Sequence, residues 1–394
     1  MKDILRNEGQ NIHQRLIEIS DYIYANPELG NEEYKAVAVL TELLKDHNFK
    51  VEEKYFNMDT AFKATFDSGK PGLTIGYICE YDALPEIGHG CGHNMIGAIS
   101  AGAGIVLSKI IDQVGGKIIV YGTPAEETNG AKVIMVEEGA FDELDCAMMV
   151  HPNDKTYASG TSSALYPIQF TFKGKTAHAA SCPEQGINAL NAVIQLFNGI
   201  DALRQHVTKD VLMHGIITEG GVAANIVPER AVAQFYIRAA KKATVMEVLE
   251  KVKNIARGAA LMTGCELEMD RYELPYDDLN TNETLSEAFN ENLRDLGVTE
   301  IHQPKTGGGS SDIGNVSYVT PTIHPYLSIT SCPTRAHSRG LAKATTESLG
   351  HERLLTAVLA LAYTGYDVLI KKSYIKIISY RELFQATPLF FIKI

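Results

Sequence analysis

The spacing of hydrophobic residues predicts two helices at the start of the chain, followed by alternating strands and helices. Apolar residues recur at helical spacing in residues 11–30 and again in residues 35–49. Three short and continuously apolar runs follow, at 73–79, 117–122 and 146–150, with helical segments between them. Strands that are apolar on both faces are typical of a parallel sheet covered by helices on both sides. We therefore predict an α/β domain with a mostly parallel sheet.

The pattern changes near residue 163. Segments 166–175 and 231–239 alternate in the manner of half-buried antiparallel strands, and two amphipathic helices accompany them. Beyond residue 273, apolar residues again recur at helical spacing, as they do near the start of the chain. This predicts an α+β domain at 164–273, inserted into a domain formed by residues 1–163 and 274–394.

Composition restricts the partners of the chain. Its 394 residues exceed the size at which a single core stops growing, and 45% of them are hydrophobic, as in ordinary globular proteins. The formal net charge of −12 argues against a nucleic-acid surface, which needs clustered Lys and Arg. No apolar run approaches the roughly 20 residues that span a bilayer, and the N-terminus lacks a signal-peptide core. We therefore expect a cytoplasmic protein without a membrane partner, whose six scattered cysteines are reduced.

Ligating side chains follow each of the three apolar runs. Cys91 and His93 come after the first run, Glu126 and Glu127 after the second, and His151 directly after the third. Because the carboxyl ends of parallel strands meet at one edge of a sheet, these side chains can converge. A thiolate, two imidazoles and a carboxylate suit zinc, manganese or cobalt. The pattern predicts a metal site in which Glu127 binds metal and Glu126 takes a proton from water.

Five segments occur in an order that identifies a family. With them the chain resembles the aminoacylase and carboxypeptidase family of co-catalytic metallopeptidases, in particular the branch with hippurate, aminobenzoyl-glutamate and auxin-conjugate hydrolases. The resemblance implies two divalent metal ions per subunit, with zinc as the first choice, and a lid domain that forms homodimers or higher oligomers. It also implies hydrolysis of an amide bond in N-acyl amino acids, aminobenzoyl conjugates or short peptides. The segments are "YDALPEIGHGCGHN", "GTPAEE", "VHP", "GKTAHAA" and "GGVAANIVPERAVAQFYIRA".

The resemblance also implies roles for residues of the larger domain. Asp82 matches an acidic residue that orients a metal-binding histidine, and Glu126 matches the general base. The last ligand is a histidine near the C-terminal end, either His324 or His337. His337 is favoured because a small hydroxyl residue and a short segment separate it from the closing helix, whereas His324 falls in an expected strand. The implied ligands are Cys91, His93, Glu127, His151 and His337.

The inserted domain carries the implied substrate-binding residues. His178 matches a histidine that reaches, often across a dimer interface, to stabilise the oxyanion of the tetrahedral intermediate. Asn225 and Arg238 match residues that bind carboxylate or carbonyl groups of the substrate, and an arginine fork suits a carboxylate. Gly308 lies in a glycine run, 306–312, of the kind that borders the substrate pocket. The tail 373–394 has no counterpart, and we expect it to pack on the body or on another subunit.

Two functions of other classes remain open at this point. Cys91 could be the nucleophile of a cysteine-dependent hydrolase, with His93 or His151 as its base. The chain could also be a binding protein that keeps the fold without the chemistry, although the presence of Glu126 argues against this. Inhibition by a chelator and recovery with zinc or manganese, without sensitivity of the metal-loaded form to limited alkylation, would separate the metal-dependent hydrolase from the cysteine-dependent one.

Overall fold

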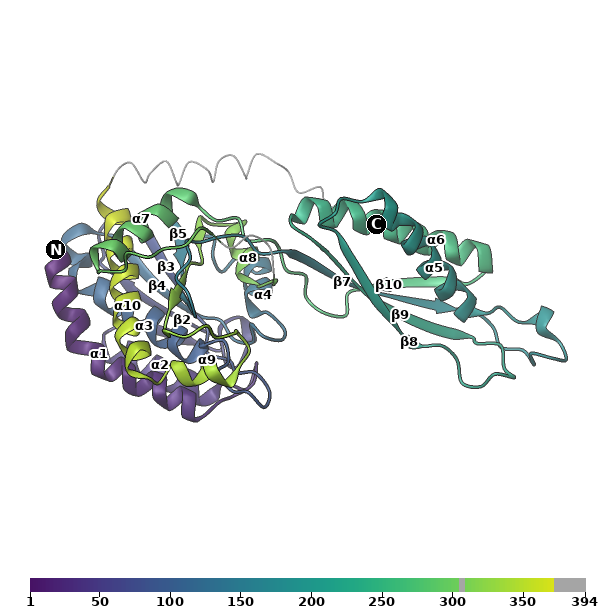
Figure 1. Ribbon diagram of the computed structural model, residues 1–394, viewed down its shortest axis with the longest axis horizontal. Helices are drawn as coiled ribbons and strands as arrows, with labels where there is room; N and C mark the ends of the chain where they lie inside the picture. The colour runs from purple at the N-terminus through teal and green to yellow at the C-terminus, as the bar shows by residue number, and fades with distance from the viewer. Residues whose placement is uncertain (305–308, 372–394) are drawn as a thin grey trace. The chain divides into compact units, whose positions relative to one another are not determined.

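The computed structural model describes residues 1–304 and 309–371, which form two compact units (Figure 1). The first unit contains residues 1–161, 279–304 and 312–371, and the second contains residues 162–278 and 309–311. The chain therefore divides near 162 and 278, where the hydropathy pattern predicted 164 and 273. Gly308 and the tail 373–394, for which the sequence analysis made predictions, lie outside the described residues.

The first unit is built on a six-stranded sheet with the order β1-β2-β4-β3-β5-β11. Strands β4, β3, β5 and β11 run parallel, while β1 and β2 join the edge next to β4 in antiparallel pairing. The predicted α/β class is confirmed, with an antiparallel edge that the apolar runs did not predict. The strands are β1 (Lys50–Glu53), β2 (Phe62–Asp67), β3 (Thr74–Cys79), β4 (Lys117–Gly122), β5 (Cys146–Met148) and β11 (Thr322–Ile323).

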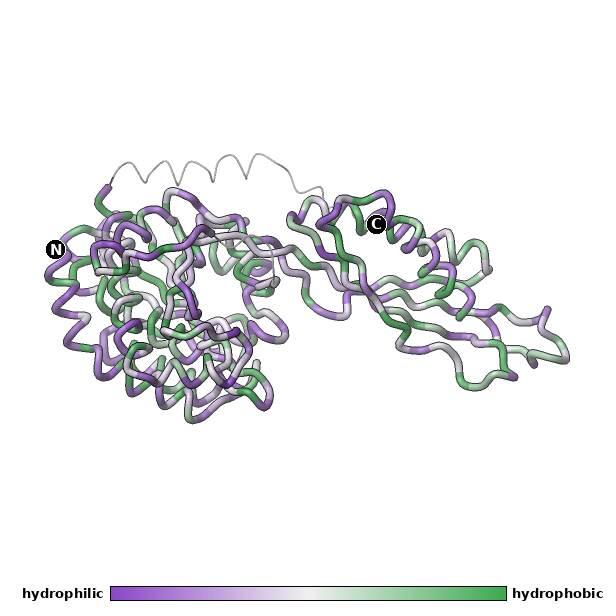
Figure 2. Tube along the Cα trace, in the orientation of Figure 1, coloured by the Kyte–Doolittle hydropathy of each residue, from purple (hydrophilic) through white to green (hydrophobic). Residues whose placement is uncertain are grey.

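Helices cover both faces of this sheet because successive residues of its central strands point to opposite sides. Tyr77 and Val120 belong to a core shared with four long helices, whereas Ile78 and Tyr121 belong to a second core under two short ones. The hydropathy along these elements can be followed in Figure 2. The long helices are α1 (Lys2–Ala25), α2 (Tyr34–Asp46), α3 (His93–Val114) and α10 (Ser348–Ile370), and the short ones are α4 (Ala131–Glu137) and α8 (Ile313–Ser317).

Smaller elements complete the first unit. A two-stranded parallel ladder pairs His151 with Tyr326, and α7 packs against α10. These elements are β6 (His151–Asn153), β12 (Tyr326–Ser328), α7 (Glu283–Asp295), α9 (Arg339–Ala344) and the 3₁₀ turn Tyr55–Asn57.

Two helices of the first unit, α3 and α10, are long and apolar enough to cross a membrane by length and composition. This differs from the expectation that no apolar segment approaches that length. In the 18-residue segment of each helix that passes this test, the share that is buried inside the structure is 94% for α3 and 67% for α10. Their hydropathy is therefore accounted for by the protein core.

The second unit is an antiparallel sheet with the order β10-β7-β9-β8 and two helices packed on one face. The predicted α+β class of the insertion is confirmed. Strand β8 lies at the edge of the sheet, and its Leu212 and Ile216 are 57% and 62% exposed. The elements are β7 (Ala164–Lys173), β8 (Leu212–Glu219), β9 (Arg230–Ala239), β10 (Glu266–Asp270), α5 (Ala189–Leu203), α6 (Lys242–Thr263) and the 3₁₀ turns Pro183–Gln185 and Arg204–His206.

Candidate active site

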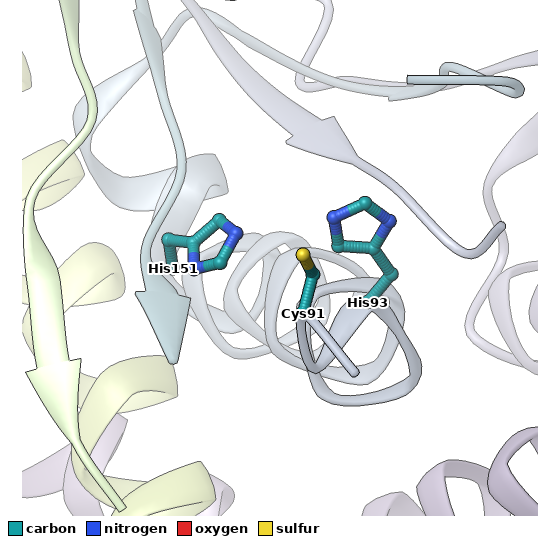
Figure 3. Close-up of side chains that lie close together, drawn as sticks. All are labelled: Cys91, His93 and His151. Atoms are coloured by element: carbon teal, nitrogen blue, oxygen red, sulfur yellow. The ribbon is translucent and has the colours of Figure 1, made fainter. Parts of the chain in front are cut away.

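Side chains from separate elements of the first unit meet near the carboxyl ends of β3, β4 and β5. Cys91, His93 and His151 point toward one another, and their ligand atoms lie within 4.8 Å of each other (Figure 3). Cys91 also groups with Glu127 and His337 within the same distance, and His93 groups with Glu126 and Glu127. Cys91, His93 and Glu127 each belong to two of these three groups, so the groups overlap in one site.

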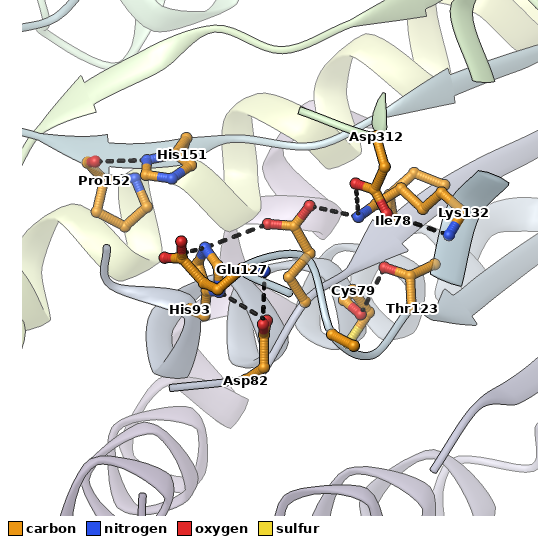
Figure 4. A network of polar contacts seen from close by, with 12 residues as sticks. Ile78, Cys79, Asp82, His93, Thr123, Glu127, Lys132, His151, Pro152 and Asp312 are labelled. Carbon is orange, nitrogen blue, oxygen red and sulfur yellow. Dashed lines mark hydrogen bonds and ion pairs between the residues drawn. The ribbon is translucent and has the colours of Figure 1, made fainter. Parts of the chain in front are cut away.

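Buried His93 and half-buried His151 are both oriented to act as metal ligands. The Nδ1 atom of His93 lies 2.8 Å from Oδ1 of Asp82, and Nδ1 of His151 lies 2.7 Å from the carbonyl oxygen of Pro152 (Figure 4). Because both partners accept the hydrogen bond, Nδ1 is the donor in each ring, which leaves Nε2 as the atom that can face a metal ion. The Nε2 of His93 faces carboxylate oxygens of Glu80 and Glu127 at 3.6 and 3.9 Å.

Charge around this point favours a bound cation. Burial opposes protonation of His93, but the carboxylates of Asp82, Glu80 and Glu127 outweigh it and raise its pKa well above the ordinary value. Oε1 of Glu127 is buried and has no hydrogen-bond partner among the described residues. Divalent cations bound here would satisfy both groups, so the residues present fit a metal site.

The environment of Cys91 suits a ligand better than a nucleophile. Burial and the nearby carboxylates of Glu127 and Glu126 raise the pKa of the Cys91 thiol. Without a cation this thiol stays protonated, and a protonated thiol is a poor nucleophile. The thiolate needed for the cysteine-dependent alternative is therefore disfavoured by its own surroundings.

Backbone geometry brings the loops of the site together. Gly92 has φ +80 and precedes α3, and this left-handed turn lets Cys91 and His93 face the same side. His337 also has positive φ, at +57, and its N–H donates to the carbonyl oxygen of Gly90 at 3.1 Å. This hydrogen bond ties the loop of His337 to the loop of Cys91, although 246 residues separate them in the sequence.

Asp82 connects two of the predicted ligands. One of its oxygens holds His93, and the other accepts a hydrogen bond from the backbone N–H of Glu127 at 2.9 Å. Asp82 is 1% exposed, so its charge is not screened by water. This geometry supports the positioning role that the resemblance implied.

A buried ion network lies beside the site. The ammonium group of Lys132 is 2.7 Å from Glu80 and 2.7 Å from Asp312, and all three side chains are at most 2% exposed (Figure 4). Burial, Glu80 and Asp312 together raise the pKa of Glu126 well above its ordinary value. The network therefore places negative charge next to Glu126 and favours a proton on it.

The two histidine candidates for the last ligand differ in surroundings. His324 is 5% exposed and lies between β11 and β12, with its ring 5.4 Å from that of His151 and 5.0 Å from that of Tyr326. The sequence analysis placed it inside a strand. His337 belongs to a candidate ligand group and His324, among the described residues, does not. The choice of His337 stays a prediction that this arrangement supports.

The substrate-binding candidates of the insertion belong to the second unit. His178 and Asn225 lie on adjoining loops, since the N–H of Ala179 donates to the carbonyl oxygen of Asn225 at 3.0 Å. The exposed His178 ring accepts hydrogen bonds at Nδ1 from the N–H groups of Ala180 and Ser181, both at 3.2 Å. Nε2 must then carry the proton, which makes His178 an outward-facing donor. Arg238 lies on β9, with its guanidinium 5.7 Å from the ring centre of Tyr236.

Two charged residues near the site were missed from the sequence. Lys132 is a lysine at the start of an apolar helix, with no acidic residue three or four positions away, which is a weak signal for a buried ion pair. Glu33 lies in an acidic segment before α2, where a helix-capping role is the ordinary interpretation. Its side chain instead accepts a hydrogen bond from Ala125 N–H at 2.8 Å, next to Glu126.

Sequence comparison relates the chain to known hydrolases. The family model described as "Peptidase dimerisation domain" matches residues 166–262. The Xaa-Arg dipeptidase of Mus musculus is 34% identical over 374 residues, which cover 91% of this chain and 86% of that protein. One of the chains of the p-aminobenzoyl-glutamate hydrolase of Escherichia coli is 34% identical over 308 residues, or 73% of this chain and 63% of that one.

Structure comparison agrees on the fold. The YXEP protein of Bacillus subtilis, described as a dinuclear metal binding peptidase from the M20 family, superposes with a TM-score of 0.69. It is 18% identical, and the match covers 91% of this chain and 99% of that one. The two-unit architecture is therefore shared over nearly the full length of both chains.

Proposed function

The chain belongs to the M20 family of peptidases and hydrolyses amide or peptide bonds; we propose that it uses two divalent metal ions and Glu126 as the general base. The family resemblance carried by the five sequence motifs is confirmed by these relatives. The observation that carries the proposal is the pair of three-residue groups that share Cys91.

Residues of the first unit would hold the ions. His93 and His151 would bind one ion and Glu127 and His337 the other, with the Cys91 thiolate shared between them. Zinc fits this mixture of sulfur, nitrogen and oxygen ligands best, and manganese or cobalt are alternatives. Bound divalent ions would supply activation of water and polarisation of the amide carbonyl.

Glu126 is suited to move the proton. It is half-buried, it adjoins Glu127, and Glu80 and Asp312 favour its protonated form. A carboxylate that readily accepts a proton can take one from water and deliver it to the leaving amine. Asp82 contributes by fixing the orientation of His93 and the backbone at Glu127.

We propose short peptides and N-acylated amino acids as the substrate class. Mammalian relatives named Xaa-Arg dipeptidase match 91% of the chain, so dipeptides that end in arginine are the first substrates to assay. Aminobenzoyl-glutamate and N-acetyl amino acids, suggested by the names of other relatives, complete the panel. The carboxylate of any of these would pair with Arg238, and Asn225 and Gly308 are the further residues that we propose for substrate binding.

The test combines metal content with turnover. Glu126→Gln keeps the size of the side chain and removes its basicity, so kcat should fall by roughly 10²–10⁴ while the metal content stays at the wild-type value. Glu138→Gln is the matched control, because Glu138 is an exposed carboxylate twelve positions further along the chain. This variant should keep the kcat and the metal content of the wild type. Near-normal turnover of Glu126→Gln would remove Glu126 from the base role.

We further propose that the chain works as a homodimer through the second unit. The matched dimerisation domain supports association, and the exposed apolar residues of edge strand β8 suit pairing with a second copy. In such a dimer His178 would donate its Nε2 proton to the oxyanion in the partner's site. Mixing inactive His178→Ala and Glu126→Gln subunits should then restore activity, and no recovery after proven subunit exchange would refute the proposal.

A further inference from the structure

The loop that carries Glu126 and Glu127 contains a residue in an uncommon backbone conformation. Ala125 has φ +61, which an L-residue with a side chain seldom adopts. The loop closes on this residue, because its carbonyl oxygen accepts hydrogen bonds from Thr128 N–H at 3.2 Å and Gly130 N–H at 2.7 Å. The conformation of Ala125 therefore sets the direction in which the two following glutamates leave the loop.

A distant segment, between α1 and α2, holds this conformation from outside. The N–H of Ala125 donates to Oε1 of Glu33 at 2.8 Å, across 92 positions of sequence. Glu33 is fully buried with Thr60 beside its carboxyl group, and no hydrogen bond of normal geometry reaches its second oxygen, Oε2, within the described residues. A buried carboxyl group with an unsatisfied oxygen destabilises a fold, and such costs concentrate where function needs a fixed geometry.

The same segment touches the loop at a second point. A Cβ atom added to Gly30 would stand 2.8 Å from Cβ and 2.9 Å from Cα of Ala125, and 2.4 Å from Oγ1 of Thr128. Those distances are shorter than real carbon contacts, so only glycine allows the segment to lie this close. Gly30 thus packs against Ala125, and Glu33 holds it by a hydrogen bond.

We propose that Glu33 is a positioning residue, which acts with Gly30 to keep Ala125 left-handed and thereby places Glu126 and Glu127. Without an acceptor, the buried Ala125 N–H would be unsatisfied and the residue would relax toward negative φ. The peptide that follows would then rotate and move both glutamates. The proposal rests on the functions proposed above for Glu126 and Glu127.

The decisive pair of variants is Glu33→Met and Glu33→Gln. Methionine has a similar length but no oxygen, so kcat should fall on the order of 10- to 100-fold, the loss that a displacement of about 1 Å produces. KM should change little, and the metal content should fall because Glu127 moves with the loop. Burial raises the pKa of Glu33 to about 7, so glutamine resembles its protonated form and keeps the acceptor. Glu33→Gln should therefore retain the kcat and metal content of the wild type.

Controls separate positioning from a general loss of stability. Glu32→Gln removes an exposed carboxylate one residue away and should leave kcat and metal content unchanged. Gly30→Ala pushes directly on Ala125 and should reproduce the loss of kcat and metal. Gly72→Ala introduces an equally close contact, 2.5 Å from the nitrogen of Gly116, at a turn that takes no part in the site. It should lower the melting temperature without lowering kcat of the folded protein.

The outcomes are distinguishable. Wild-type kcat and metal content in folded Glu33→Met, or an equal loss in Glu33→Gln, would overturn the positioning role while leaving the proposed function intact. If Glu33→Met does not fold, Gly30→Ala decides by the same two measurements, and wild-type values there overturn the proposal. Glu126→Gln, assayed in the same series, tests the base itself, and full activity of that variant would overturn both.

Discussion

Glu33→Gln should make the protein more stable at neutral and alkaline pH, although it removes a charged residue. The carboxyl group of Glu33 is fully buried, and burial raises its pKa from 4.5 to about 7. In the unfolded chain the same group ionises at its ordinary value. Each pKa unit is equivalent to about 1.4 kcal/mol, so ionisation of Glu33 lowers the free energy of unfolding by about 3 kcal/mol once the pH exceeds 7.

The sign and the pH window follow from the direction of the shift. Since the folded-state pKa lies above the unfolded-state pKa, the folded protein holds its proton more tightly. The stability that Glu33 contributes is therefore fully present below pH 4.5 and is lost as the pH rises to about 7. Glutamine does not titrate, so the free energies of unfolding of variant and wild type should be similar at pH 4.5 and diverge in favour of the variant by pH 8.

Urea unfolding of the chelated protein measures this difference without a contribution from metal binding. The chain has no tryptophan, so unfolding is followed by circular dichroism at pH values from 4.5 to 8. Glu32→Gln removes the same charge from the surface and should follow the wild-type curve. A difference between Glu33→Gln and wild type that stays constant with pH would refute the assignment of the shift to burial of Glu33.

Three further variants address the metal centre, the buried ion network and the proposed dimer. Cys91→Ala should lower the metal content measured by elemental analysis, whereas Cys332→Ala, at an exposed cysteine, should leave it unchanged. Lys132→Met should destabilise the protein in urea by about 3–5 kcal/mol because two buried carboxylates lose their cation, and adding Asp312→Asn should restore part of that loss. If Lys132→Met lowers the free energy of unfolding by less than about 1 kcal/mol, the predicted role of Lys132 in the buried network is wrong. Ile216→Lys should shift the protein to monomer in analytical ultracentrifugation if β8 forms the interface, and an unchanged mass would exclude that edge.

Local patterns predicted the parts of the structure that depend on local rules. Continuous apolar runs identified β3, β4 and β5 because strands buried on both faces have no polar side. The residues that follow those runs identified Cys91, His93, Glu127 and His151 as neighbours, since parallel strands bring their carboxyl ends to one edge. The strands β1, β2 and β8 were not predicted. The strands β1 and β8 are half-exposed edge strands, and β2, between β1 and β4, alternates buried and half-buried residues, so none of the three has a continuous apolar run.

The sequence by itself determined the fold class and the family, and it supplied the residues that we propose as metal ligands. Only the tertiary structure decided which contacts hold those residues and their loops in position. It paired Lys132 with Glu80 and Asp312, joined His337 to Gly90, and placed Glu33 against Ala125. Each of these contacts joins segments that lie more than fifty positions apart in the sequence. Only the packed chain brings such groups within hydrogen-bonding distance, because burial removes the water that would otherwise serve as their partner.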